Sequence, residues 1–204
     1  MQDIFAHVDA HADRYITDLQ RLLRQPSVAA QNVGMAACAS LVEEMLVGVG
    51  ANPHQVDTRG GFPVVYGEIA GTTAKTLSFY NHYDVQPAEP LDLWESDPWA
   101  AEIRDGRIWA RGCSDNKGNI AARIAAVDAY QQVRGRLPLS VKFIIEGEEE
   151  IGSPHLEHFA EDHPDLCRAD ACVWEFGGKD IDGRPVVHLG LKGICYVELR
   201  VSGA

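Results

Sequence analysis

Short apolar runs of strand length alternate with longer runs of helical spacing along this chain of 204 residues. The strand-like runs fall at 62–69, 76–80, 139–145, 171–174, 186–189 and 194–201. The helix-like runs fall at 8–23, 33–49 and 117–133, and Ser153-Pro154 is typical of a further helix start, with the serine as N-cap. This alternation predicts an α/β fold, a three-layer αβα sandwich around a mostly parallel, mixed central sheet.

Charge and cysteine content narrow the classes of protein. A net charge of −12 with no basic cluster argues against a nucleic-acid or anionic membrane partner. No apolar run approaches the ~20 residues of a membrane span, and the N-terminus does not resemble a signal peptide. The five cysteines form no CxxC pair, which indicates free thiols and a cytoplasmic location. Cys167 and Cys172 are too widely spaced for a zinc pair and are expected to be buried or partly buried.

A histidine and an aspartate follow the apolar run 76–80, with one residue between them. In an extended chain His82 and Asp84 point to the same side. An imidazole beside a carboxylate is either a metal ligand with its orienting partner or a catalytic pair. The position just past a buried strand is where open α/β sheets bind ligands.

Further carboxylates occupy similar positions. Asp115 precedes the helix-like run 117–133, where the usual role of an aspartate is that of an N-cap. The acidic run 146–150 directly follows a strand, and Glu175 follows another. An acidic run is usually a solvated face, but carboxylates crowded at a buried strand end repel one another unless a cation or a shifted pKa compensates.

These groups are expected to converge, because parallel strands end at one edge of a sheet. An imidazole with several carboxylates and no thiolate suits a hydrolytic Zn²⁺ or Mn²⁺ site. Two adjacent glutamates can then divide the work, one binding metal and the other transferring protons.

The chain resembles the M20 metallopeptidases, and within them the dipeptidase branch that includes the carnosinases. The matching motifs are HYDVQP at 82–87, DPW at 97–99, RGCSDNKG at 111–118, EGEEEIGS at 146–153, Glu175 and GLKGICY at 190–196. The resemblance implies two divalent metal ions, Zn²⁺ first, with Mn²⁺ or Co²⁺ as alternatives. The metal ligands that it implies are His82, Asp115, Glu150 and Glu175.

The same resemblance assigns the remaining roles. Glu149 would be the general base and Asp84 would orient His82, while Asp115 would bridge the two metals and form a cis peptide bond with Asn116. The implied reaction is hydrolysis of dipeptides or short peptides by a water held between the two metals. Two alternatives stay open: an N-acyl amino acid deacylase or desuccinylase on the same scaffold, or an inactive metal-binding fragment.

The second alternative follows from the domain organisation that the resemblance implies. Residues 1–190 would be the N-terminal part of a catalytic domain, and 191–204 would begin a truncated lid and dimerisation domain. The late metal-binding histidine of the family is not found in the chain, since its other histidines match no ligand motif. The full-length protein is expected to be a homodimer that takes a small peptide substrate.

Overall fold

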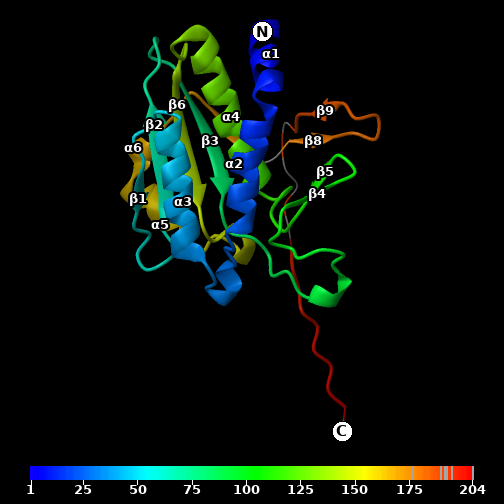
Figure 1. Cartoon of the computed structure of the whole chain (residues 1–204). Helices are drawn as coiled ribbons and strands as arrows, with labels where there is room; N and C mark the ends of the chain where they lie inside the picture. Colours follow the sequence, from blue (N-terminus) through cyan, green and yellow to red (C-terminus); the bar gives the residue numbers. More distant parts are fainter. Residues whose placement is uncertain (176, 189, 191–192, 194, 204) are drawn as a thin grey trace.

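A mixed β-sheet forms the centre of the molecule (Figure 1). In this computed structural model, residues 1–175, 177–188, 190, 193 and 195–203 are described. The strand order is β1-β2-β6-β3-β7, with bounds β1 His54–Val56, β2 Val64–Ile69, β3 Thr76–His82, β6 Ser140–Glu146 and β7 Ala171–Trp174. Strand β3 runs parallel to β6 and to β7, whereas the β1–β2 and β2–β6 pairs are antiparallel. The predicted mixed α/β sheet is therefore confirmed.

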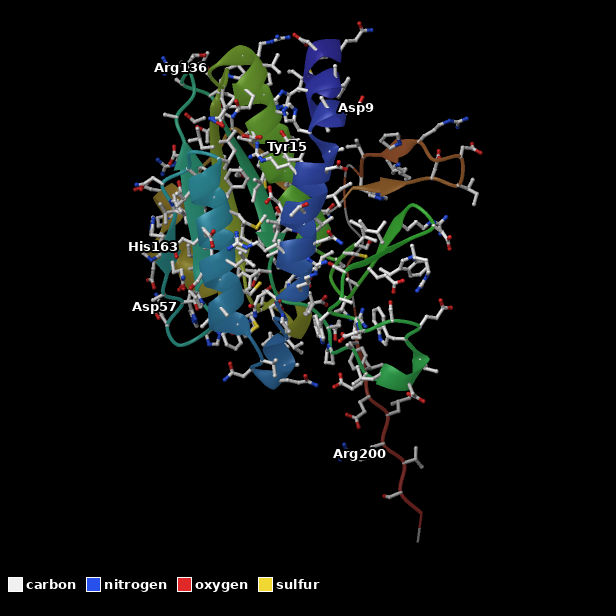
Figure 2. The ribbon with its side chains drawn as sticks, viewed as in Figure 1. Asp9, Tyr15, Asp57, Arg136, His163 and Arg200 are labelled. Carbon is white, nitrogen blue, oxygen red and sulfur yellow. The ribbon has the colours of Figure 1, made fainter. Side chains whose placement is uncertain are left out.

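One face of the sheet is covered by long helices (Figure 1). These are α1 Gln2–Ala10, α2 Ala12–Arg24, α3 Met35–Gly48 and α4 Lys117–Arg134. Alternate strand residues such as Val65 and Phe143 point into this layer and form the main core with apolar helix residues. Tyr15 joins α2 to α4, since its hydroxyl donates to Asp128 at 2.8 Å (Figure 2).

The helix predicted over 8–23 is divided in the structure. The chain turns at His11, which leaves helical geometry with φ −118°. Its Nδ1 lies 2.8 Å from the carbonyl oxygen of His7, so the side chain bonds to the backbone beside the turn. Regular apolar spacing continued across this residue, which is why the spacing alone did not reveal the break.

The opposite face carries a thinner layer. Helices α5 Leu156–Asp162 and α6 Pro164–Cys167 cover it, and Phe159 packs among Tyr66, Tyr80 and Ile144. The prediction that Ser153 caps a helix is wrong. Helix α5 starts three residues later, and the Ser153 hydroxyl donates instead to Glu146 Oε1 at 2.8 Å.

The remaining elements are short. They are the hairpins β4 Glu102–Arg104 with β5 Arg107–Trp109 and β8 Gly178–Lys179 with β9 Pro185–Val186, and the 3₁₀ turns η1 Ala29–Gln31, η2 Leu91–Leu93 and η3 Glu149–Ile151. The strand predicted over 186–189 is present only at Val186, and residue 189 lies outside the described residues.

The C-terminal residues run away from the sheet (Figure 1). The strand predicted over 194–201 is not found in its described part, since 195–203 form neither helix nor strand, and residue 194 lies outside the described residues. An alternating pattern forms a strand only when a partner satisfies its backbone groups. The domain boundary at residue 191 stays a prediction.

Two expectations from composition can be compared with the fold. The cysteines are free thiols, as predicted, and Cys167 is half-buried, which also agrees with the prediction, but Cys172 is exposed. The expectation for Cys172 is wrong because β7 is an edge strand whose residues are all exposed. Within the part of the chain that the structure describes, no helix has the length and apolarity to cross a bilayer.

Candidate metal centre

The site lies where β3 and β6 end side by side. His82 is paired in register with Glu146, and the Tyr83 N–H donates to the Glu146 carbonyl at 2.8 Å. Because these strands are parallel, the segments that follow them leave the same edge of the sheet. Asp84 and the acidic loop 146–153 therefore meet, although about 60 residues separate them in the chain.

His82 is the buried centre of the group, with 0% exposure. Its Nδ1 lies 3.0 Å from the Asp84 carbonyl oxygen, and its Nε2 lies 3.0 Å from Asp115 Oδ1. Burial by itself would lower the pKa of His82, but the surrounding carboxylates, first that of Asp84, raise the pKa to about 9. Nδ1 therefore faces Asp84, and Nε2 faces Asp115.

Asp84 does more than contact the imidazole. Its fully buried carboxylate accepts the Glu149 N–H at 3.2 Å and the Glu150 N–H at 3.0 Å. Its Oδ1 lies 3.3 Å from His82 Nδ1. One carboxylate therefore fixes both the histidine and the backbone of the acidic loop. The sequence indicated only the first of these contacts, because the second joins residues that are distant in the chain.

Three consecutive glutamates of this loop face in different directions. Glu148 is buried, and its Oε2 lies 2.9 Å from His155 Nδ1. Glu149 approaches the site, with Oε2 3.8 Å from His82 Nε2. Glu150 accepts a bond from Gln86 Nε2 at 2.9 Å. Only the second and third glutamates are therefore available to His82.

The ligand atoms of His82, Glu149 and Glu150 lie within 4.8 Å of one another. Burial, and then neighbouring carboxylates such as that of Glu175, raise the pKa of Glu149 to about 7, although His82 opposes the shift. Burial also raises the pKa of Glu150 and of Glu175. These carboxyl groups are thus partly withdrawn from solvent beside one imidazole, and imidazole with carboxylates is a donor set suited to a divalent cation.

Asp115 and Glu175 border this group. Asp115 forms a cis peptide bond with Asn116, as the resemblance implied, and its side chain is 58% exposed. The N-cap interpretation of Asp115 is wrong, because Asn116 occupies that position and makes no side-chain cap bond. Glu175 follows β7, and its N–H donates to the Tyr80 carbonyl at 2.9 Å. Neither side chain joins the compact group of three in the described residues.

Comparison with known proteins assigns the family. The sequence matches peptidase family M20/M25/M40 over residues 78–193, a range that contains every predicted site residue. The chain belongs to this family. It is similar to a Beta-Ala-His dipeptidase of Homo sapiens, with 33% identity over 99% of this chain and 43% of that protein. It is also similar to the Cys-Gly metallodipeptidase dug1 of Schizosaccharomyces pombe, with 30% identity over 100% of this chain and 46% of that protein.

The fold agrees with this assignment. An M20 family metallo-carboxypeptidase of Sulfolobus solfataricus, Sso-CP2, superimposes with a TM-score of 0.79 and 39% identity, covering 83% of this chain and 39% of that chain. The chain thus spans less than half the length of the relatives that it matches. Membership of the M20 metallopeptidase family implies that the protein binds divalent metal ions. The group of His82, Glu149 and Glu150 could hold such an ion.

Other histidines of this M20 chain take other positions. His155 contacts Glu148, and His163 lies beside Phe159 in the α5–α6 layer (Figure 2). The sequence reasoning missed Arg123, which reaches the ends of β3 and β7 from α4. The available signal was its spacing, because Arg123 lies three residues after Ile120 and four before Val127, on the apolar side of the helix.

Proposed function

We propose that the complete protein is a metal-dependent peptidase that hydrolyses dipeptides or short peptides. The observation that carries the proposal is the compact group of a buried histidine and two glutamates, one with a pKa of about 7. The names of the related dipeptidases and of the metallo-carboxypeptidase support peptides as the substrate class.

The proposal includes two divalent ions, Zn²⁺ first and Mn²⁺ or Co²⁺ as alternatives. His82, Asp115, Glu150 and Glu175 would hold them. Imidazole and carboxylate donors fit these ions, and the gathering of several carboxylates around His82 supports a cation here. When bound, such ions polarise the scissile carbonyl and lower the pKa of the attacking water.

Glu149 is the general base of the proposed reaction. Its carboxylate takes a proton from the attacking water and then donates that proton to the leaving amine. Its Oε2 lies 3.8 Å from His82 Nε2, which puts this carboxylate beside the proposed ions and within reach of a water held there. Asp84 holds the Glu149 backbone and the His82 ring in place during both transfers.

The test is a substrate panel on the complete protein, loaded separately with Zn²⁺, Mn²⁺ and Co²⁺. The panel contains dipeptides, including β-Ala-His and Cys-Gly, together with N-acyl and N-succinyl amino acids. Faster turnover of dipeptides supports the proposal. Turnover of the acylated amino acids alone would replace it with the deacylase or desuccinylase alternative.

Assembly, location and the fragment alternative need separate measurements. We propose that the complete protein forms a homodimer through the region that begins at residue 191, and light scattering of the complete protein tests this. We also propose that the protein is located in the cytoplasm. Metal analysis of residues 1–204 beside the complete protein tests the inactive-fragment alternative. Two tightly bound ions and turnover in residues 1–204 alone would contradict that alternative.

A further inference from the structure

Arg123 links the ends of two strands from a buried position on α4. The residue is 9% exposed, and its Nη1 donates to the Tyr80 carbonyl at 2.6 Å and to Asn81 Oδ1. Its Nη2 donates to the backbone carbonyl of Glu175. One guanidinium therefore binds the end of β3 and the residue that follows β7.

The link continues to the opposite side of the site. Asn81 Nδ2 donates to Asn116 Oδ1, and both asparagines are completely buried. Asn116 is the residue directly after Asp115. A continuous polar chain thus runs from Glu175 through Arg123, Asn81 and Asn116 to Asp115. Its link in β3 is Asn81, the residue directly before His82.

The two ends of this polar chain also contact β3. Asp115 Oδ1 lies 3.0 Å from His82 Nε2, and the Glu175 N–H donates to the Tyr80 carbonyl at 2.9 Å, but both ends are less enclosed than the middle of the chain. The side chain of Asp115 is 58% exposed, and β7 is an exposed strand that pairs with β3 alone in the described sheet. A guanidinium presents its donors in a rigid fork, so it can fix the relative position of several acceptors, which an ammonium group does less well. Burial lowers the pKa of Arg123 to about 10, which leaves it protonated at neutral pH.

We infer that Arg123 is a positioning residue that sets the place of Glu175 relative to Asp115, and so the affinity of the site for divalent ions. The inference rests on the proposed metal centre, which makes both carboxylates ligands. Arg123 touches neither substrate nor ion in this role. It acts through the Glu175 backbone and the Asn81–Asn116 amide pair.

The first test is Zn²⁺ affinity of the complete protein, measured by competition with a chromophoric chelator. Arg123→Lys should weaken binding by about 10- to 100-fold, the range for residues that orient metal ligands. The matched control is Lys142→Met. Lys142 is a buried cation that also donates to two carbonyls, at 2.7 and 2.9 Å, but under the α5–α6 layer. The control should lower Tm and leave Zn²⁺ affinity unchanged.

The second test needs no metal. Amide hydrogen exchange in excess chelator reports the Glu175 N–H, bonded to Tyr80, and the Ile120 N–H, bonded to Asn116. Arg123→Lys should accelerate both, relative to Lys142→Met. Asn81→Ser removes the amide link while leaving the bonds of Arg123 to backbone carbonyls, so it should accelerate Ile120 more than Glu175.

The outcomes separate this inference from the proposed function. Wild-type Zn²⁺ affinity and wild-type exchange in Arg123→Lys would overturn the inference and leave the peptidase proposal intact. If the wild-type protein binds no divalent ion, the proposed function and the affinity part of the inference both fail. Should Arg123→Lys fail to fold, unchanged affinity and exchange in Asn81→Ser would overturn the inference.

Discussion

The two halves of the candidate metal centre are held in different ways. The loop half, His82 with Glu149 and Glu150, is fixed by the buried carboxylate of Asp84. The edge half, Asp115 with Glu175, is more exposed and is joined through Arg123 and two asparagines. The difference follows from their positions, since β3 and β6 are central strands, whereas β7 lies at the edge of the sheet and Asp115 lies outside the sheet, before α4.

Ligand groups of the same chemical type are thus held with different rigidity in the two halves. The loop half has its anchor within the group, so its geometry is set before any ion binds. The edge half has its anchor on a helix, and the connection crosses several side chains. We therefore expect substitutions in the loop half to affect the chemistry most, substitution of Arg123 to affect ion affinity, and substitution of exposed β7 residues such as Trp174 to affect mainly stability.

The largest effect is expected for Glu149→Gln in the loop half. Loss of the proposed general base should lower kcat by about 10²- to 10⁴-fold without loss of Zn²⁺ binding. Steady-state kinetics and metal analysis of the complete protein measure this. Glu148→Gln is the matched control, because the adjacent carboxylate faces His155 instead of His82. Equal loss of kcat in both variants would contradict the role of Glu149.

Asp84→Asn tests the anchor of the loop half. The two carboxylate oxygens of Asp84 each accept one N–H, from Glu149 and from Glu150. An amide has only one oxygen that can accept, so one of these bonds is lost and the loop should shift. We expect Zn²⁺ affinity to fall by about 10- to 100-fold and the free energy of unfolding to fall by about 1–3 kcal/mol.

Asp170→Asn is the control for this change. Asp170 accepts the Thr76 N–H at 2.8 Å at the opposite end of β3, far along the strand from His82. It should therefore lower stability without changing Zn²⁺ affinity. A similar affinity loss in both variants would show that β3 as a whole, and not Asp84, determines the site.

The pH dependence of the free energy of unfolding should also report on His82 and Glu149 of the loop half. The pKa of Glu149 is raised to about 7 and that of His82 to about 9 in the ion-free site. The folded protein thus binds more protons than the unfolded chain from about pH 5 to pH 9, and the free energy of unfolding should fall as pH rises through this window. Bound metal should reverse the trend, because its ligands must be deprotonated.

Urea unfolding at several pH values, with chelator and with Zn²⁺, measures both trends. Glu149→Gln should reduce the slope of the metal-free protein between about pH 5 and pH 7. An unchanged slope in this variant would place the titrating groups elsewhere, and it would remove this distinction between the halves.

The smallest effect is expected near β7. Trp174 stacks on Tyr80 with ring centroids 3.9 Å apart, but it is 53% exposed. Trp174→Ala should lower the free energy of unfolding by about 0.5–1.5 kcal/mol and change kcat little. Trp109→Ala, on the β4–β5 hairpin, is the control for loss of an exposed tryptophan. A large fall in kcat for Trp174→Ala alone would show that the edge half is as sensitive as the loop half.

Much of the fold could be predicted because its signals are local. Apolar spacing indicated α3, α4 and strands β2, β3, β6 and β7, since each period reflects the face that an element buries. The break at His11 and the role of Ser153 were missed, because each depends on a single side-chain bond to a neighbouring group. The pattern over 194–201 was misleading, since alternation does not supply a partner strand.

The sequence by itself determined the order of the elements, the M20 motifs and the types of donor at the strand ends, because these depend on residue identity and local spacing. Only the tertiary structure decided which donors face His82. Glu148 turns toward His155, while Asp84 binds the backbone of Glu149 and Glu150. These directions come from contacts between distant parts of the chain, which no local pattern records.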